Sequence, residues 1–360
     1  MAQSIFSQLL VELQKNKNHD ASIERCKAII KDLENHLDKR VVAYFSSDVG
    51  NDAASMVNDD DVFIIENLLS ISSAKKDLVL ILHSSGGFSL SAERIIDVCR
   101  NYCAQKNDES KFFVIVPKKA KSAASIVALG ADKICLRDTA ELGPVDPQFI
   151  VADKKRENIQ LEPAYLYVDA LENIFDNENL GPFKKYFKKN SSKPLSRLPN
   201  EMKLKILEQC NYAMYVNAKN ELSLSDSIIG KISTEKIRQY PNISSKDFDV
   251  FRDPHITKSH GRLINFSDLK DNALQTEKII ERLENLFEDK NKYKTFDNLL
   301  WELYVRKHQL VNDQGNYIVK TIESTEEFFV NFGMKRGQKN PSQKEKTPEE
   351  IKPEETMQPQ

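Results

Sequence analysis

The sequence has few cysteines and no long apolar run, and both absences narrow the class of protein. The five cysteines are odd in number, and their spacings give neither a disulfide framework nor a CxxC metal motif. We therefore expect reduced, partly buried thiols and no metal site. No apolar stretch approaches the roughly 20 residues of a membrane-spanning helix, and the N-terminal segment lacks the apolar core of a signal peptide. These features predict a cytoplasmic protein without a membrane span.

An excess of charge of one sign is also missing. The 360 residues carry a formal net charge of −2, with 40% hydrophobic and 29% charged residues, which is the composition of a soluble globular chain. Without an overall positive field, the chain is not expected to bind nucleic acid. A G-x-G-x-x-G fingerprint is absent as well, so nothing in the sequence calls for a dinucleotide, and we expect no cofactor.

Hydrophobic spacing and composition divide the chain into four parts. Residues 1–39 are predicted to be helical, 40–290 to form the main domain, and 291–332 to form a small α+β element. Residues 333–360 are charged and proline-rich, and are predicted to be a disordered tail. Further elements are expected at 41–47 (strand), 59–72 (helix), 161–290 (mainly helical) and 316–324 (strand).

Within the main domain, short continuous apolar runs predict strands that are buried on both faces. They occur at 78–82, 112–117 and 133–136. The intervening segments 89–105 and 122–131 have the apolar spacing of helices. This alternation of strand and helix predicts an α/β fold with a parallel sheet and right-handed crossovers.

The first segment that could carry chemistry is the loop HSSGG, residues 83–87, which follows the strand 78–82. Ligands of open α/β sheets bind at the carboxyl ends of the strands, and adjacent glycines let main-chain N–H groups approach a substrate closely. Donors of this kind form an oxyanion hole and contribute roughly 3–4 kcal/mol each to transition-state stabilisation. On their own, two glycines in this place more often form a plain turn.

The second segment is KSAAS, residues 121–125, where Ser122 stands between the strand 112–117 and an apolar helix. A serine at a helix start is by itself a common N-cap. The two segments together favour catalysis, because consecutive parallel strands are usually neighbours and would bring a nucleophile and N–H donors to one carbonyl group. Ser125, one turn into the helix, is the rival nucleophile.

These motifs stand in an order that resembles one family. The segments LVLILHSSGG, SAERIIDVCR, VIVPKKAKSAASIVALGADKICL and AELGPVDPQ resemble the serine dehydrogenase proteinase family, a relative of signal peptide peptidase A and, more remotely, of the Clp protease proteolytic subunit. The resemblance covers roughly residues 40–150 well. It implies a Clp-protease/crotonase-like spiral of parallel βαβ units with N-terminal and C-terminal helical extensions, and it implies a homo-oligomer.

Carried over by position, the resemblance implies that Ser122 is the nucleophile and that Gly86 and Gly87 form the oxyanion hole. His83 and His260 also match family positions. We expect His83 to hold the loop by hydrogen bonding, and His260 to cap or pack against a helix.

The sequence departs from the family pattern at two places near these residues. HTPGG has become HSSGG, and SAGT has become SAAS, so that Ala124 replaces a glycine beside the nucleophile. The alanine could narrow the site, or it could mark an inactive descendant.

The proton acceptor for Ser122 is the part that the motifs leave open. The region ELGPVDPQF holds no histidine at the spacing of Clp-type enzymes, and Asn173 and Ile174 stand where signal peptide peptidases have a lysine. The nearest lysines are Lys184 and Lys185. A catalytic lysine must be desolvated, whereas a lysine-rich run is more often a solvated face. Lys184 and Lys185 therefore stand as candidates for the base.

Three functions fit these observations. The first is a serine peptidase or peptidase-like hydrolase that acts on a peptide or protein without metal or cofactor. The second is a catalytically inactive scaffold or peptide-binding module, which the missing base and Ala124 favour. The third is a crotonase-like acyl-CoA enzyme, which shares the oxyanion architecture but makes no use of Ser122. In each case the long polar tail could recruit a partner protein.

Overall fold

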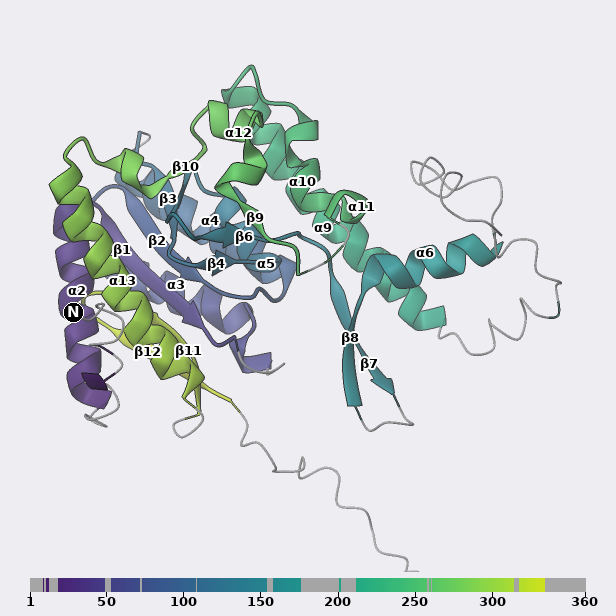
Figure 1. The fold of residues 1–360 in the computed structure, drawn as a ribbon, viewed down its shortest axis with the longest axis horizontal. Coiled ribbons are helices and arrows are strands. Elements are labelled where there is room, and N and C mark those ends of the chain that lie inside the picture. Colours follow the sequence, from purple (N-terminus) through teal and green to yellow (C-terminus); the bar gives the residue numbers. More distant parts are fainter. Residues whose placement is uncertain are drawn as a thin grey trace, which may run out of the picture.

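The structure is a computed structural model in which part of the chain can be described. The described residues are 9, 11–12, 19–48, 53–71, 73–107, 109–153, 158–175, 201, 212–257, 259, 261–313 and 317–333. Lys184, Lys185, His260, Cys210 and the tail from residue 334 onward lie outside them. Figure 1 shows a central sheet with helices on both faces and an arm that projects from this body.

The strands of the described ranges form a seven-stranded central sheet in the order β10-β5-β3-β2-β1-β11-β12. The strands from β10 to β1 are parallel, whereas β11 and β12 form an antiparallel hairpin beside β1. The sheet confirms the predicted α/β class with a mostly parallel sheet. The strands are β1 (Arg40–Ser46), β2 (Leu78–His83), β3 (Phe112–Val116), β5 (Lys133–Leu136), β10 (Ile280–Arg282), β11 (Ile318–Glu323) and β12 (Phe328–Phe332).

Helices cover both faces of this sheet because the central strands carry apolar side chains on both sides. One face packs against α2 (His19–Leu37) and α13 (Lys290–Asn312), which also pack against each other. The other face packs against α3 (Asp59–Ser70), α4 (Ser89–Lys106) and α5 (Ala123–Leu129). The predicted helices at 59–72, 89–105 and 122–131 are thereby confirmed.

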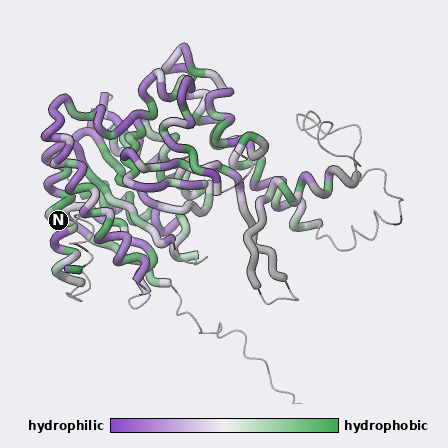
Figure 2. Tube along the Cα trace, viewed as in Figure 1, coloured by the Kyte–Doolittle hydropathy of each residue, from purple (hydrophilic) through white to green (hydrophobic). Residues whose placement is uncertain are grey.

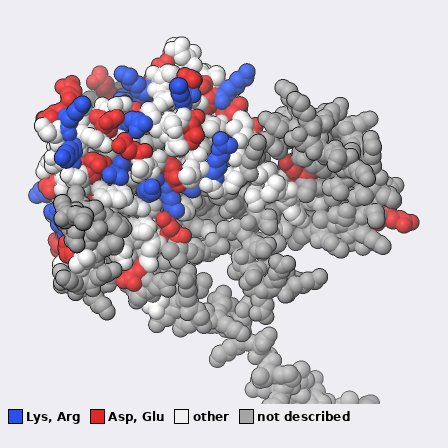
Figure 3. Space-filling view, in the orientation of Figure 1, with Lys and Arg blue, Asp and Glu red and all other residues white. Residues whose placement is uncertain are grey.

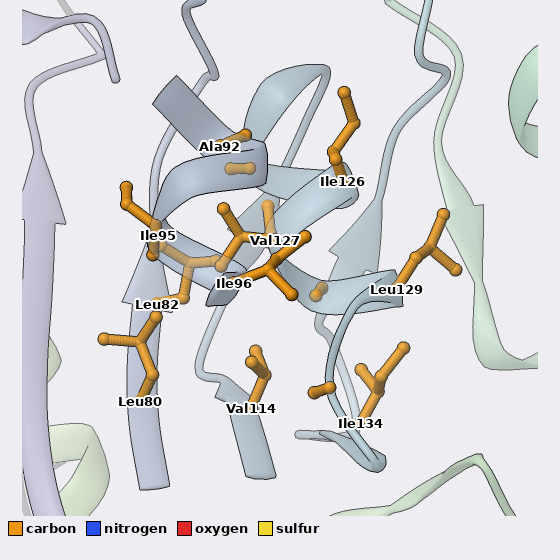
Figure 4. Close-up of a cluster of buried hydrophobic side chains, with 14 of the residues drawn as sticks. Leu80, Leu82, Ala92, Ile95, Ile96, Val114, Ile126, Val127, Leu129 and Ile134 are labelled. Atoms are coloured by element: carbon orange, nitrogen blue, oxygen red, sulfur yellow. The ribbon is translucent and has the colours of Figure 1, made fainter. Parts of the chain in front are cut away.

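Alternation along β2 shows how the two cores are separated. Val79 and Ile81 belong to the cluster beneath α2 and α13, whereas Leu80 and Leu82 belong to the opposite cluster. Figure 4 shows Leu80 and Leu82 in the latter cluster, together with Ile96 of α4 and side chains of α5. The apolar colour along the strands in Figure 2 shows the same concentration of hydrophobic residues inside the body.

Smaller elements surround the central sheet. β4 (Lys119–Ala120), β6 (Glu141–Leu142) and β9 (Ile264–Asn265) form a short second sheet, and β7 (Gln148–Asp153) pairs with β8 (Asn158–Pro163). α6 (Ala164–Phe175) packs along α9 (Tyr212–Gln239). The remaining elements are η1 (Ala53–Ser55), η4 (Ser245–Phe248), α10 (Asp249–Arg252), α11 (Pro254–Thr257), η5 (Phe266–Leu269), α12 (Ala273–Thr276) and η6 (Leu283–Leu286).

The C-terminal part is built into the sheet. The predicted strand at 316–324 appears as β11, but it pairs with β1 in the central sheet. The segment 161–290, predicted to be mainly helical, also contributes β10, which pairs with β5 at the other end of the sheet. Local hydrophobic spacing does not show which strand a short segment will join, because pairing depends on distant residues.

The surface charge agrees with the small formal net charge of −2. On the face shown in Figure 3, basic and acidic side chains are interleaved over the described body. None of the helices in the described ranges combines the length and apolar character needed to cross a membrane.

The four described cysteines are free and buried, and burial raises the pKa of the Cys26 thiol to about 11. A neutral, buried thiol of this kind cannot serve as a nucleophile near pH 7.

Candidate active site

The loop after β2 is fixed on one side by β4. The Ser84 N–H donates to the carbonyl oxygen of Lys119 at 3.1 Å, and the Lys121 N–H donates to the carbonyl oxygen of Ser84 at 3.1 Å. The Ser84 hydroxyl also accepts a hydrogen bond from the Gly86 N–H at 3.1 Å. The loop that carries the glycines is thus held against the segment that leads into Ser122.

On its other side, the same loop pairs with Val57. The Val57 N–H donates to Gly86 O at 2.9 Å, and the Phe88 N–H donates to Val57 O at 2.8 Å. Successive residues of an extended segment direct their backbone groups to opposite sides, so the Gly87 N–H is directed away from Val57. No hydrogen bond to this N–H is found in the described part of the chain, so it can donate to a ligand.

Gly86 brings the loop into contact with Ser122. Its φ of +108° lies in a region that L side chains rarely adopt. A Cβ at this position would lie 2.6 Å from the carbonyl oxygen of Lys121 and 2.7 Å from the Cβ of Ser122. Only glycine allows the two segments to approach this closely.

Ser122 has an unusual backbone conformation. Its φ is 50° and its ψ is −123°, and it directly precedes α5. Its side chain caps no N–H group of the helix, and its hydroxyl makes no hydrogen bond to the described residues. Such a backbone costs about 1–3 kcal/mol and persists where the surrounding structure enforces it. The plain N-cap interpretation therefore does not account for this serine.

The residue after Ser122 supplies a second free donor. The N–H of Ala123 is at the start of α5, where the first N–H groups have no partner within the helix, and it lies 3.1 Å from a Cβ placed on Gly86. In the two segments that meet here, the N–H groups of Gly87 and Ala123 are thus without a hydrogen-bond partner among the described residues, whereas the Gly86 N–H donates to the Ser84 hydroxyl. Our reading of the sequence missed Ala123, although the N–H that follows a nucleophile at a strand-to-helix turn is a common oxyanion donor.

Ser125 has a structural role. It is fully buried, and its hydroxyl oxygen lies 2.7 Å from Ala120 O and 2.8 Å from Gly143 O. It also accepts a hydrogen bond from the Gly143 N–H at 3.0 Å. Ser125 therefore joins β4 to the end of β6, and its hydroxyl is not available to a substrate.

Ala124, which replaces the glycine of the family pattern, is fully buried in the hydrophobic cluster beneath α4 and α5. Its methyl group contributes to the packing of α5.

His83 lies on the opposite face of the sheet from Leu82 and Ser84, because alternate residues of β2 point to opposite faces. Its ring packs edge-on against Tyr304, with centroids 5.1 Å apart, and its Nε2 is 3.6 Å from an Asp48 carboxylate oxygen. Within the described residues neither ring nitrogen makes a hydrogen bond, so the expected bond from His83 to the loop is absent. Burial lowers the pKa of His83, which leaves the ring neutral near pH 7.

The described lysines nearest to Ser122 in the chain are already paired with carboxylates. Lys121 Nζ lies 3.2 Å from Glu141, and Lys119 Nζ lies 2.8 Å from Asp48. The structure thus brings the glycine loop against Ser122 and the start of α5, and no hydrogen bond from the Ser122 hydroxyl is found among the described residues. No group of three His, Cys, Asp or Glu side chains in those residues is placed to hold a metal ion.

The short helix α5, which begins beside Ser122, is anchored at its far end by cationic side chains. Arg100 of α4 donates to Gly130 O at 2.7 Å, and Lys236 of α9 donates to Ala131 O at 2.6 Å. Cations at a helix C-terminus satisfy its free carbonyl groups and its dipole. Lys236 is 1% exposed, and burial lowers its pKa to about 8.

Because the pKa of Lys236 is lowered in the folded protein, its contribution to the free energy of unfolding depends on pH. Between pH 8 and the ordinary value of 10.5, unfolded Lys236 binds more protons than folded Lys236, so its contribution to stability rises with pH by about 3 kcal/mol. Below about pH 8 the contribution is constant. Lys236→Met lacks this titrating group. Raising the pH from 8 to 10.5 should therefore increase the unfolding free energy of wild type, relative to that of Lys236→Met, by about 3 kcal/mol. Urea melts at several pH values measure it, with exposed Lys76→Met as the control. A flat difference across this window would contradict the prediction.

Residues 5–155 match the family model described as ClpP-like SDH-type serine proteinase. The resemblance inferred from the motifs is confirmed. The matched stretch contains β1 to β6 and both segments of the candidate site, whereas α9, α13 and the β11–β12 hairpin lie beyond it.

Two uncharacterized proteins of Methanocaldococcus jannaschii are similar in sequence. One is 41% identical over 85 residues, which is 23% of this chain and 28% of that protein. The other is 30% identical over 124 residues, which is 33% of this chain and 40% of that protein. The chain thus spans less than half the length of these curated relatives.

Among solved structures, two mutants of the 1510-N membrane-bound stomatin-specific protease are similar to the chain. The first is 14% identical and covers 32% of this chain and 55% of that one, with a TM-score of 0.24. The second, in complex with a substrate peptide, is 16% identical and covers 38% and 57%, with a TM-score of 0.24.

Proposed function

We propose that this chain is a serine peptidase in which Ser122 attacks a peptide carbonyl group. The observation that carries the proposal is the strained backbone of Ser122, which follows the close approach of Gly86 and is followed in turn by the Ala123 N–H, with the Gly87 N–H one residue further along the glycine loop. A nucleophile and two donors around one carbonyl group are what acyl transfer requires. Membership of residues 5–155 in the ClpP-like serine proteinase family supports the same chemistry.

The reaction follows from these groups. The Ser122 oxygen forms a bond to the carbonyl carbon while its proton passes to a general base, and the N–H groups of Gly87 and Ala123 stabilise the negative oxygen. The C–N bond then breaks, the leaving amine takes up the proton, and water releases the acyl group from Ser122. Lys184 and Lys185 remain our proposed candidates for the base. With a serine, a general base and backbone donors, these steps call for no metal or cofactor.

A peptide-binding module without catalysis is the second candidate. It is favoured by the ion pairs of Lys119 and Lys121, which leave the described residues without an acceptor for the Ser122 proton. A crotonase-like acyl-CoA enzyme is disfavoured, because that chemistry gives no reason to hold Ser122 in a strained conformation. A homo-oligomer, a cytoplasmic location and a partner for the tail remain predictions.

A fluorophosphonate probe tests the proposal on the full chain. Trypsin should release the peptide that follows Lys121, SAASIVALGADK, which contains both candidate serines. We expect fragmentation spectra to place the adduct on Ser122, and urea-unfolded protein to remain unlabelled. An adduct on Ser125 would overturn the assignment. The absence of any adduct on folded protein would favour the binding module.

A further inference from the structure

The loop that carries Gly87 is supported from a distant part of the chain. Its partner Val57 lies between Met56 and Asn58, just before α3. The Lys320 ammonium group, from β11, donates to Met56 O at 2.6 Å. The same ammonium group lies 2.7 and 2.9 Å from the two carboxylate oxygens of Asp61.

Asp61 completes this support. Its carboxylate accepts a hydrogen bond from the Asn58 N–H at 2.9 Å and another from the Tyr44 hydroxyl at 2.8 Å. The Lys320–Asp61 pair therefore binds the carbonyl group before Val57 and the N–H group after it. Both side chains of the pair are fully buried, so water does not compete for these bonds.

A second buried ion pair on the same strand provides a comparison. Lys307 of α13 lies 2.5 Å from Glu323 of β11, and both side chains are fully buried. Among the described residues, none of the contacts found for this pair reaches the segments 56–58 or 86–88. The two pairs share their chemistry, their burial and their strand, and only Lys320–Asp61 contacts the segment that pairs with the glycine loop.

We propose that Lys320 and Asp61 are positioning residues that hold the Gly87 N–H in place for the oxyanion. The inference rests on the proposed peptidase reaction. From the pair, the contacts run through the backbone of Met56 and Asn58 to Val57, and from Val57 to Gly86 and Phe88. The C-terminal strand, which lies outside the family match of residues 5–155, thus completes the site formed within that match.

The Lys320–Asp61 pair should affect the reaction rate because it fixes the position of the Gly87 N–H. An oxyanion donor acts only within hydrogen-bond reach of the developing charge, and a displacement of about 1 Å lowers a rate by roughly 100-fold. Without the pair, Met56 O and Asn58 N–H lose their partners, so Val57 and the loop attached to it are free to shift. Ser122 makes no hydrogen bond to residues 56–58 among those described, and its carbonyl oxygen accepts from the Ile126 N–H of α5 at 3.2 Å, so its conformation should persist.

The test is the double variant Lys320→Met/Asp61→Leu. Removing both charges leaves no unpaired buried ion, and apolar replacements of a buried pair are often tolerated. We expect cooperative unfolding to persist, while the second-order rate constant of fluorophosphonate labelling falls by about 10- to 100-fold.

The matched control is Lys307→Met/Glu323→Leu, which should keep the wild-type labelling rate. Amide exchange of Val57 and Phe88 gives a second readout, because their N–H groups form the pairing between the two segments. Exchange at these amides should accelerate in the Lys320→Met/Asp61→Leu protein and stay unchanged in the control.

The outcomes separate positioning from general stability. Equal labelling rates in the two variants, whether both reduced or both as in wild type, would overturn the proposal. If wild type itself is not labelled at Ser122, the peptidase proposal fails, and amide exchange alone decides whether the pair holds the loop. Exchange that is unchanged in the Lys320→Met/Asp61→Leu protein would then refute the positioning role as well.

Discussion

Replacing Ser122 with alanine should abolish fluorophosphonate labelling and leave the protein folded. The nucleophilic oxygen is lost, and removal of a nucleophile lowers catalysis by about 10⁴-fold or more. Little stability should be lost, because the Ser122 side chain caps no helix N–H group. A true N-cap serine would instead cost about 1 kcal/mol on replacement with alanine.

The strained backbone of Ser122 predicts a difference in stability between two substitutions at this position. Glycine adopts a positive φ without strain, so Ser122→Gly should be more stable than Ser122→Ala by about 1 kcal/mol. Urea melts of the two variants measure the difference. The control is Ser85→Ala, which removes an exposed hydroxyl from the adjacent loop and should keep full labelling. Persistent labelling of Ser122→Ala would show that another residue is the nucleophile.

Replacing Gly87 with alanine should lower the labelling rate by about 10²- to 10³-fold. The new Cβ would meet the backbone N and O of Val57 and lie 2.8 Å from its Cα. Backbone atoms cannot move aside as a flexible side chain does, so the pairing between Val57 and the loop must open. The Gly87 N–H then leaves its position beside Ser122, and we expect a stability loss of about 1–3 kcal/mol as well.

A variant with a steric conflict against a side chain elsewhere in the core separates the loss of stability in Gly87→Ala from the loss of labelling. In Gly130→Ala the new Cβ would meet the side chain of Ile96, beneath α4 and away from the loop. We expect Gly130→Ala to lose stability and to label at the wild-type rate at temperatures where it is folded. A Gly87→Ala protein that labels at the wild-type rate would show that this N–H is not an oxyanion donor.

The main elements of the fold could be predicted because their patterns are local. The runs at 78–82, 112–117 and 133–136 contain almost only apolar residues, and such runs form strands covered on both faces. Consecutive parallel strands usually lie side by side, which correctly placed β2 beside β3 and the glycine loop near Ser122. Shared motifs also predicted the similarity to the family whose model matches residues 5–155.

Details of the site could not be predicted, because they depend on where each backbone group points. The sequence suggested two glycine donors, but the Gly86 N–H donates to Ser84 and the donor next to Ser122 belongs to Ala123. His83 was expected to hold the loop, yet the alternation of β2 turns its ring to the other face. The strand was predicted to end at residue 82, but β2 includes His83. With that residue counted in the strand, alternation would have placed its ring on the face opposite Leu82.

By itself, then, the sequence determined the α/β class, the family similarity of residues 5–155 and the two segments that meet at the site, because local hydrophobic patterns and contiguous motifs encode them. Only the tertiary structure decided the strain at Ser122, the choice of donors and the role of the C-terminal strand. Lys320 and Asp61 are 259 residues apart in the chain, and no local pattern marks such a pair. Their contact exists only because β11 pairs with β1 and thereby brings a lysine beside the start of α3.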